Sequence, residues 1–348
     1  MTPKVTVSVG SSRPGGIDIL LASLKAQTFT DFEVVFTDQR YHKRHAQVLD
    51  AVEAVGLTVP FFHVPNQRNS PGWVSSCAGV NTGFMLSAGE IVIMLLDYAY
   101  CPPGWIEAHL KHHVDRRRVV MSPHIYHALP EVVTKDGRPP TRFTNGGAES
   151  TVEAIEQQRE NFYETTIFRQ PFRPSVFAEM PQYVPPHQDP KLYRPEGIAN
   201  WDVMHTKNES FRREDVLAIG GIDENFDRGG GPGDLLFGCQ LVSIGCEPWI
   251  CQEAAVHVLD PRPILPSTRV AGHGREWVAA GLGKWSYTEG ETYWRERMGE
   301  KTHVSRNPYD MREKRKELWH WRDLSQQREP VIPYIEKTDA EYFGLVKK

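Results

Sequence analysis

Strand-like and helix-like patterns alternate over the first third of the chain, and this alternation limits the possible folds more than any other feature. β-rich or fully apolar segments predict strands at 4–9, 32–37, 58–64 and 91–96. Apolar spacing predicts helices between them, at 17–24, 75–87 and 42–55, the last with an inward face of Ala46, Leu49, Val52 and Val55. Strands that alternate with helices form a mainly parallel sheet with right-handed crossovers. The sequence therefore predicts an α/β fold, whose ligands bind beyond the carboxyl ends of the strands.

Size and composition exclude several other classes of protein. The chain has 348 residues, 40% of them hydrophobic, and a formal net charge of -4, which indicates a globular protein with a large core. The longest apolar run, at 91–96, is too short to cross a bilayer, and the first residues show no signal-peptide pattern. The five cysteines contain no C-x-x-C spacing, which favours reduced thiols over a disulfide framework or a zinc site. These features predict a cytoplasmic protein.

Two aspartates end predicted strands. Asp38 follows the second strand and Asp97 follows the most apolar one. At such a position Asp38 is either a turn residue or a carboxylate that accepts a hydrogen bond from a nucleotide. Asp97 ends a buried strand, so it needs a cation, a hydroxyl group or backbone N–H groups beside it. Both aspartates are candidates for ligand binding at the carboxyl edge of the sheet.

A glycine-rich segment comes directly before Asp234. Gly230, Gly231 and Gly233 allow the backbone to approach a ligand closely or to form a flexible loop. A helix predicted at 234–244 then begins, so Asp234 is either its N-cap or a general base that faces a bound acceptor.

Histidines stand out at two further places. His257 lies in a short apolar strand predicted at 254–259, where a histidine is either a core residue or a ligand. His112, His113 and the arginines at 116–118 form a basic cluster at the end of a helix predicted at 105–114. That placement favours a solvated face near the negative end of the helix dipole over a phosphate site.

Several motifs, in this order along the chain, resemble family-2 glycosyltransferases of the GT-A fold. Residues 21–35, LASLKAQTFTDFEVV, are similar to the family's "SLLAQTYxxFEVIVVDD" stretch, and residues 5–14 resemble its first strand and donor loop. Residues 78–90 resemble its "ARNxGIxxAxGE" segment, and residues 96–99 fall on its D-x-D motif. Residues 211–226 resemble its acceptor-side "RRExLxxIGGFDExF" segment.

The resemblance implies a fold, an activity and a division of the chain. The fold is GT-A: a Rossmann-like, mostly parallel sheet flanked by helices, here with a C-terminal helical or irregular extension. The activity is inverting transfer of a hexose from a nucleotide-sugar, a UDP-sugar in our prediction, to an acceptor hydroxyl. The predicted regions are a nucleotide-sugar-binding half at 1–122, a Pro- and aromatic-rich insertion at 123–200 with a helix at 152–162, an acceptor-binding half at 201–260, and an extension at 261–348 with a helix at 310–322.

The resemblance also implies roles for single residues. Asp38 would contact the nucleotide base, Asp97 the ribose and diphosphate, and Asp234 would be the catalytic base. Asp97 and His257 would hold a divalent metal, Mg²⁺ or Mn²⁺. The remaining predicted contacts are Gly10, Ser11, Arg13, Asn81 and Tyr98 for the donor, and Trp201, Gly230, Gly231 and Gly233 for the acceptor.

Departures from the family pattern leave alternatives open. Ala99 replaces the second aspartate of D-x-D, so Asp97 and His257 form a thin site for a cation that prefers about six oxygen ligands. The metal is then either supported by diphosphate oxygens or weak, with Tyr98, Tyr100 or basic side chains stabilising the leaving group. The family's Q-x-x-R-W pattern of processive members is missing, which favours a single transfer.

Two other functions stay open beside the main prediction. Ala99 and Gly233 are what a catalytically decayed GT-A protein that still binds a nucleotide or sugar would show. The acceptor is a glycan, a lipid, a protein or a modified DNA base, and a hydroxymethylpyrimidine glycosyltransferase would need a local basic groove.

Overall fold

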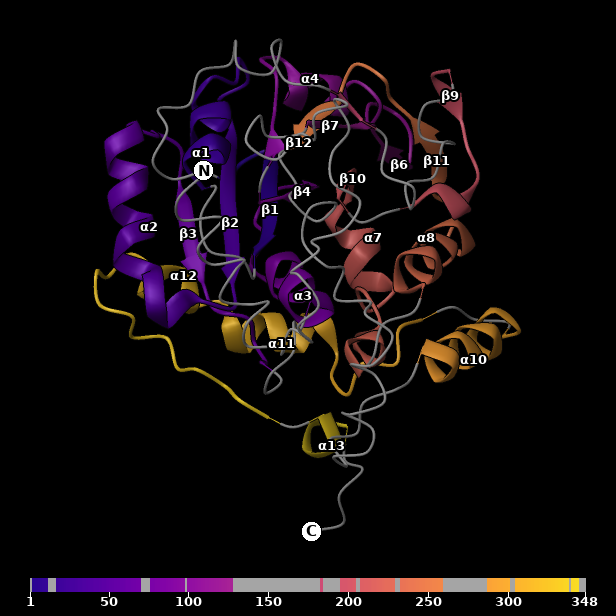
Figure 1. The fold of residues 1–348 in the computed structure, drawn as a ribbon. Coiled ribbons are helices and arrows are strands. Elements are labelled where there is room, and N and C mark those ends of the chain that lie inside the picture. The colour runs from indigo at the N-terminus through magenta and orange to yellow at the C-terminus, as the bar shows by residue number, and fades with distance from the viewer. Residues whose placement is uncertain are drawn as a thin grey trace, which may run out of the picture.

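The computed structural model describes residues 2–11, 17–69, 76–97, 99–127, 182–183, 195–204, 207–228, 232–258, 287–300, 304–337 and 339–343. Within these residues, two sheets form the centre of the molecule (Figure 1). The larger sheet has the strand order β3 (Phe61–Val64), β2 (Phe32–Asp38), β1 (Val5–Ser11), β4 (Ile91–Leu96), β10 (Asn208–Arg212), β6 (Arg118–Met121), β11 (Glu247–Ile250) and β9 (Gly197–Ile198). The smaller has the order β5 (Ala99–Tyr100), β12 (Val256–Val258), β7 (His124–His127) and β8 (Gln182–Tyr183).

The first four strands of the large sheet run parallel, and their carboxyl ends meet at one edge. β3, β2, β1 and β4 pair in parallel, whereas β10 is antiparallel to both of its neighbours. The register places Ser11 opposite Asp38 and Gly10 opposite Leu96. The predicted α/β architecture is therefore confirmed, and Asp38 and Asp97 lie at the same edge of the sheet.

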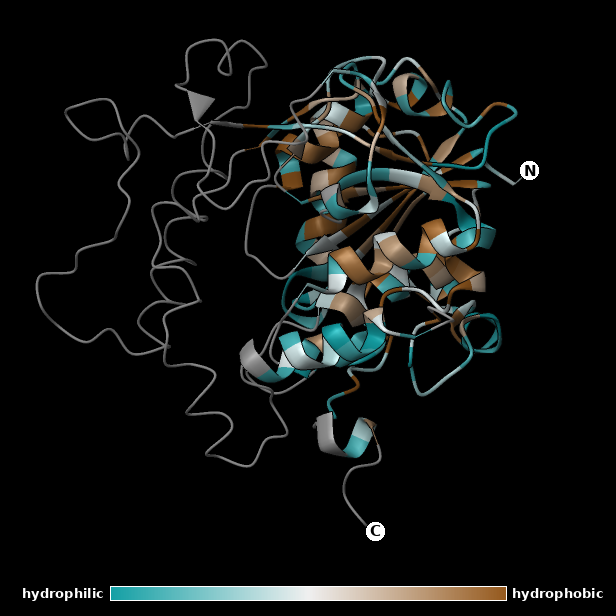
Figure 2. Ribbon diagram, turned by 90° about the vertical axis from the view of Figure 1, so that its right-hand side faces the viewer, coloured by the Kyte–Doolittle hydropathy of each residue, from teal (hydrophilic) through white to brown (hydrophobic). Residues whose placement is uncertain are grey.

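Helices cover both faces of the large sheet. Successive residues of a strand point to opposite faces, so Val34 and Phe36 join one core while Val35 joins the other. The helices of the first face are α1 (Ile17–Lys25), α2 (Tyr41–Val55) and α4 (Trp105–Leu110). Those of the second are α3 (Ser76–Leu86), α7 (Arg213–Ala218), α8 (Gly233–Ser243) and α11 (Met311–Leu318). Figure 2 shows apolar residues gathered along the strands between these layers.

Shorter elements complete the described part of the chain. They are the helices α10 (Tyr287–Met298), α12 (Trp321–Leu324) and α13 (Asp339–Tyr342) and the 3-10 turns η3 (Trp201–Val203) and η4 (Glu224–Arg228). The helix predicted at 310–322 is thus two helices, and the one predicted at 105–114 ends at Leu110. The helix predicted at 152–162 lies outside the described residues.

The inward face predicted for α2 is confirmed at Val52 and Val55, which are partly buried against the core, and wrong at Ala46, which is exposed. The buried residues of the helix are Tyr41, Arg44, His45 and Val48. The first half of the helix therefore turns a largely polar face toward the protein, and apolar spacing alone could not reveal it. That face lies beside Asp38, at the carboxyl edge of the sheet.

The C-terminal extension packs onto the N-terminal half of the large sheet. Arg322 donates to the buried carboxylate of Glu33 at 2.5 and 3.0 Å, and its guanidinium lies 3.7 Å from the ring centre of Phe62. The Asn69 N–H donates to the Ile335 carbonyl at 2.8 Å. In Figure 1, α11 and α12 lie close to α3 and β3. Residues 304–337 therefore help to build the half of the protein that carries Asp38.

No helix in the described ranges is long and apolar enough to cross a membrane. All five cysteines are free thiols: Cys77, Cys101, Cys239, Cys246 and Cys251.

Candidate active site

Asp38 and Asp97 are joined by two side chains that lie between them. Ser11, the last residue of β1, donates its hydroxyl hydrogen to Asp97 Oδ2 at 2.8 Å. Arg44, from α2, donates Nη2–H to the Ser11 hydroxyl at 2.8 Å and Nε–H to Asp38 Oδ2 at 2.6 Å. All four residues are buried. The two candidate ligand-binding aspartates therefore belong to one hydrogen-bonded unit.

The carboxylate of Asp38 accepts hydrogen bonds from three donors. Besides Arg44, these are the Arg40 backbone N–H at 2.8 Å and His63 Nε2 at 2.9 Å. Burial alone would raise the pKa of Asp38, but the positive charge of Arg44 and the bond from His63 outweigh it and hold that pKa well below its usual range. Asp38 therefore makes the contact of a turn residue, through the Arg40 N–H, and its carboxyl group is also held in the ionised form.

A pair of stacked histidines links this unit to the C-terminal extension. His63 Nδ1 lies 2.8 Å from His45 Nδ1, and His45 Nε2 lies 2.7 Å from the Gln327 carbonyl oxygen. The two ring centres are 4.9 Å apart, and the ring of Tyr41 packs against both. The chain of contacts thus runs without a break from Gln327 through Asp38 to Asp97.

His257 lies beside the segment that follows Asp97. β12 pairs with β5 so that His257 stands opposite Tyr100, and their ring centres are 6.2 Å apart. Burial lowers the pKa of the half-buried His257, which keeps the ring neutral and able to ligate a metal at neutral pH. Asp97 and His257 are the residues that would hold a divalent cation, and they suit one only together with the oxygens of a bound diphosphate.

Asp234 lies on the other side of the site, in the first turn of α8. The residue before α8 makes no side-chain cap, and the predicted N-cap role of Asp234 is not observed. A Cβ atom on Gly233 would lie 3.1 Å from the ring of Phe226, so a larger residue there would need the ring to shift slightly. Burial and then nearby acidic groups, Asp234 among them, raise the pKa of the Cys77 thiol. Asp234 therefore lies near the start of α3.

The start of α3 is capped by Asp227 of η4. Asp227 accepts the N–H groups of Cys77 and Ala78 at 2.8 and 3.0 Å and a bond from Arg68 Nη2 at 2.9 Å. Burial, and to a lesser degree the charge of Glu224, raise the pKa of Asp227 to about 6 although Arg68 lowers it. The orphan N–H groups of the helix are thus satisfied by the protein itself.

Asn81 joins α3 to the turn before η4. Its Nδ2 donates to the Ile222 carbonyl at 2.8 Å and to Glu224 at 2.9 Å, and its Oδ1 accepts the Ile222 N–H at 2.8 Å. Gly221 has φ +73°, and a Cβ there would lie 2.3 Å from Asn81 Oδ1. The donor contact of Asn81 stays a prediction, and what the structure adds is its role in joining the segments at 78–90 and 211–226.

Residues 13–175 match the model of a family described as "Glycosyl transferase family 2". The match covers somewhat less than half of the chain. The predicted α/β fold, with a large central sheet flanked by helices, is confirmed. A comparison with curated proteins finds no match.

Three solved structures are similar to this chain at low identity. S. aureus TarS 1-349, also solved in complex with UDP-GlcNAc, has 14% identity and a TM-score of 0.45, over 75% of this chain and 62% of that one. The longer S. aureus TarS has 13% identity and a TM-score of 0.44, over 75% of this chain and 38% of that one. The mannosyltransferase PcManGT from Pyrobaculum calidifontis, in complex with GDP-Man and Mn²⁺, has 14% identity and a TM-score of 0.44, over 93% and 73%. The chain spans less than two thirds of the length of the two TarS structures.

The other predicted site residues fall into two groups. Gly10 is the one exposed residue of β1, at the edge that carries Asp97, and Trp201 is half-buried in η3, which packs against α8. The second group lies outside the described residues: Arg13, Tyr98, Gly230 and Gly231.

The basic cluster at the end of α4 is divided: Arg116 and Arg117 are exposed, as predicted for a solvated face, whereas the two histidines are buried. His112 and His113 are each only 6% exposed, and His113 Nε2 lies 2.8 Å from the Ser210 hydroxyl. Arg118 bonds Glu247 at 2.8 Å and lies over the ring of Trp249. The prediction for the two histidines is wrong because the end of α4 packs against β10 and β11.

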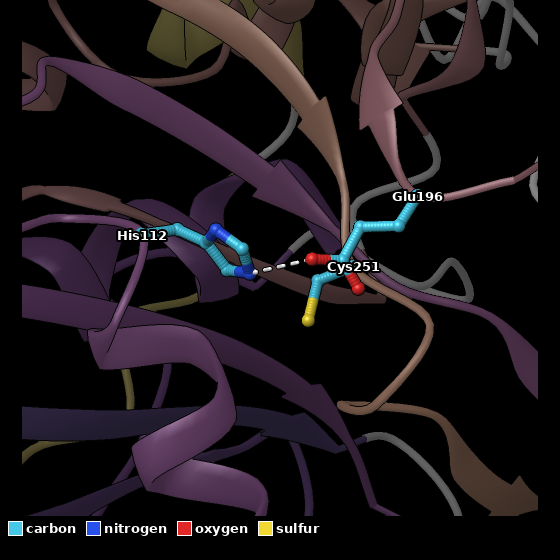
Figure 3. A group of neighbouring side chains, drawn as sticks. All are labelled: His112, Glu196 and Cys251. Atoms are coloured by element: carbon cyan, nitrogen blue, oxygen red, sulfur yellow. Dashed lines mark ion pairs between the residues drawn. The ribbon is translucent and has the colours of Figure 1, made fainter.

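One group of metal-ligand side chains occurs among the described residues, away from Asp97 and His257. The ligand atoms of His112, Glu196 and Cys251 lie within 4.8 Å of one another (Figure 3). Arg118 Nη1 already lies 3.4 Å from His112 Nδ1, and Lys111 Nζ lies 4.0 Å from Glu196. Because these two cations already contact the group, we interpret it as a structural ion-pair cluster.

Proposed function

We propose that this protein transfers a hexose from a nucleotide-sugar, a UDP-sugar in the first instance, to an acceptor hydroxyl with inversion. The proposal rests on the hydrogen bonds by which Arg44 and Ser11 join Asp38 to Asp97 at the carboxyl edge of the sheet. That edge is where α/β sheets bind their ligands. The family match over 13–175 covers the same half of the chain.

The donor nucleotide would lie over this edge. Asp38 already accepts three hydrogen bonds, and a carboxylate offers about four lone-pair sites, so one remains for a base or ribose donor. Asp97 would contact the ribose and diphosphate, beside Ser11 and the exposed Gly10. The contacts predicted for Arg13, Asn81 and Tyr98 belong to the same proposal.

Asp234 would be the general base. Its carboxylate accepts the proton of the acceptor hydroxyl as that oxygen attacks the anomeric carbon. The new bond forms on the face opposite the nucleotide, and the bond to the diphosphate oxygen breaks with its electron pair left on the diphosphate. This single displacement inverts the anomeric centre. Trp201, Gly230, Gly231 and Gly233 would frame the acceptor.

Asp97 and His257 would hold the Mg²⁺ or Mn²⁺ ion. A cation at this place would neutralise negative charge on the departing diphosphate. Because Ala99 offers no ligand, most of the coordination sphere would come from the donor and from water. We expect EDTA to abolish transfer and added Mn²⁺ to restore it, and full activity in EDTA would show that the metal is dispensable.

A second candidate function is a nucleotide-sugar-binding protein without transfer. Ala99 and Gly233, which replace two acidic residues of the family pattern, favour it. The two candidates differ in one measurement, slow hydrolysis of the nucleotide-sugar in the absence of an acceptor. Hydrolysis indicates a competent site, whereas tight binding without hydrolysis indicates a decayed one.

The experiment that tests the main proposal is a donor screen. UDP, GDP and dTDP are each added to the full chain, and the melting temperature is measured, since a ligand of the native state must raise it. UDP-, GDP- and dTDP-sugars are then incubated with glycan, lipid, protein and hydroxymethylated DNA acceptors. Failure of every nucleotide to raise the melting temperature would overturn the glycosyltransferase proposal for this chain.

A further inference from the structure

The His45–His63 pair makes three contacts that each need a ring N–H donor, whereas two neutral rings carry only two. His63 Nε2 faces the Asp38 carboxylate at 2.9 Å, and His45 Nε2 faces the Gln327 carbonyl oxygen at 2.7 Å. Neither of these oxygens can donate, so each Nε2 carries a hydrogen. Two neutral rings would then leave two bare Nδ1 atoms facing each other at 2.8 Å. A hydrogen bond at that distance needs a third proton, so the pair carries one positive charge.

That charge balances the buried unit at the donor site. Asp38 and Asp97 each contribute a negative charge, and Arg44 contributes a positive one. Among these groups, and before any cation binds at Asp97, the shared proton brings the sum of the charges to zero, and its loss leaves one net negative charge. An uncompensated buried charge is costly, which favours retention of the proton.

Two charges next to the pair act on its proton in opposite directions: Asp38 favours it and Arg44 opposes it. Tyr41 of α2 packs against both rings, at 4.5 Å from His45 and 5.1 Å from His63, and burial raises its pKa, so it stays neutral. From β2 the pair meets Asp38 and the ring of Phe36, and from the extension it meets the Gln327 carbonyl. The exposed His42 of α2 is a further titratable group near His45.

Burial opposes a positive charge on either ring, so the contacts of the pair with Asp38 and with the Gln327 carbonyl must retain the shared proton. Burial lowers the pKa of His63 to about 4, although its bond to Asp38 raises it, and the charges of His45 and Arg44 lower it further. Burial also lowers the pKa of His45. Two rings in contact titrate as one unit, and here that unit has one state that satisfies all four ring nitrogens.

We propose that Arg44 and the His45–His63 pair are positioning residues of the donor site, which hold Asp38 and Asp97 in one geometry and tie the affinity for a nucleoside diphosphate to their shared proton. The inference rests on the proposed function, because it takes these two aspartates as the donor-binding residues. Gln327 anchors the outer end of the chain of contacts, so the C-terminal extension takes part in donor binding without touching the donor.

The proposal fixes the sign of a pH effect. Loss of the shared proton adds negative charge to the site and leaves two Nδ1 lone pairs that repel each other beside Asp38. A nucleoside diphosphate is an anion, so the added negative charge repels it. Affinity for the nucleotide therefore falls as the pH rises through the titration of the pair. Arg44 acts differently, because its guanidinium bonds Asp38 and Ser11 at once through a rigid fork that a lysine cannot reproduce.

The test is calorimetric titration of the full chain with UDP, GDP and dTDP from mildly acidic to mildly alkaline pH. His45→Gln removes the titrating ring and keeps an amide that can donate and accept. Arg44→Met removes the fork and the charge, and Arg44→Lys restores the charge alone. His42→Gln is the matched control on the same helix. The phosphate of the nucleotide itself titrates at a pH of about 6. Because this titration is common to every variant, differences between the pH profiles report on the histidine pair.

The nucleotide affinity of the wild-type chain should fall on the order of tenfold toward alkaline pH, and His42→Gln should show the same fall. In His45→Gln the affinity should no longer change with pH in this way. Arg44→Met should weaken binding on the order of 100-fold, and Arg44→Lys should recover part of that loss. An unchanged profile in His45→Gln, or wild-type affinity in Arg44→Met, overturns the inference while the proposed function stands. Absence of binding to every nucleotide by the wild-type chain overturns both.

Discussion

The two sides of the candidate active site hold their carboxylates in opposite ways. On the proposed donor side, Asp38 is fully buried and accepts three hydrogen bonds, one of them from His63, which His45 links to the C-terminal extension. On the acceptor side, Asp234 is half-buried, and no hydrogen bond reaches its carboxylate from the part of the chain that the structure describes. A binding geometry benefits from rigid support, whereas a general base must stay accessible to the proton that it takes. The contrast therefore fits a binding role for one carboxylate and a proton-transfer role for the other.

The largest expected effect is on the rate of transfer, when the aspartate of the proposed acceptor side is changed to asparagine. Asp234→Asn removes the base and keeps its shape, so we expect transfer to fall by about 10²–10⁴-fold. UDP binding and the melting temperature should stay at their wild-type values, because no described contact depends on the charge of Asp234. Steady-state rates and the thermal shift with UDP, measured on one preparation, check both halves of this statement. A variant that still turns over at the wild-type rate would remove Asp234 from the mechanism.

Asp38→Asn should act on stability as well as on donor binding. The change leaves Arg44 in the protein without its anionic partner, and breaking a buried ion pair costs about 3–5 kcal/mol. Denaturant unfolding of this variant should show a loss of that size, whereas Asp234→Asn should show almost none. If the two variants unfold alike, the difference between the two sides does not exist.

The sequence predicted the aspartates but not what holds them. Asp38, Asp97 and Asp234 follow strands or begin a helix at places where local patterns are visible, so they could be found without coordinates. Arg44 lies on a helix whose apolar spacing points elsewhere, toward Ala46 and Leu49, and its buried polar face forms only because the helix lies against the carboxyl edge. His63 sits inside a short strand, where its bond to Asp38 depends on the pairing of β2 with β3. Such contacts join residues far apart in sequence and leave no local signal.

The extension can be tested with two arginines that differ in burial. Arg322→Ala breaks the pair with Glu33, whose side chain is 1% exposed, and should cost about 3 kcal/mol of unfolding free energy. Arg328→Ala breaks an exposed pair with Asp50 and should cost less than about 1 kcal/mol. Denaturant unfolding compares them directly. Because Arg322 supports the donor side, its variant should also weaken UDP binding, and equal effects of the two changes would show that the extension is only attached to the surface.

The smallest expected effect, measured per unit of pH, concerns two buried histidines that contact β10. Burial lowers the pKa of His109 and of His113 to about 3, and both rings bond the Ser210 hydroxyl. The unfolded chain binds a proton at each ring below a pH of about 6.5 while the folded chain does not, so stability falls as the pH drops from there toward the folded-state values. Each ring contributes a slope of up to about 1.4 kcal/mol per pH unit. Denaturant unfolding at a series of acidic pH values measures this slope, and His113→Gln should reduce it by one proton. A variant that keeps the full wild-type slope would show that groups other than these histidines cause the loss of stability in acid.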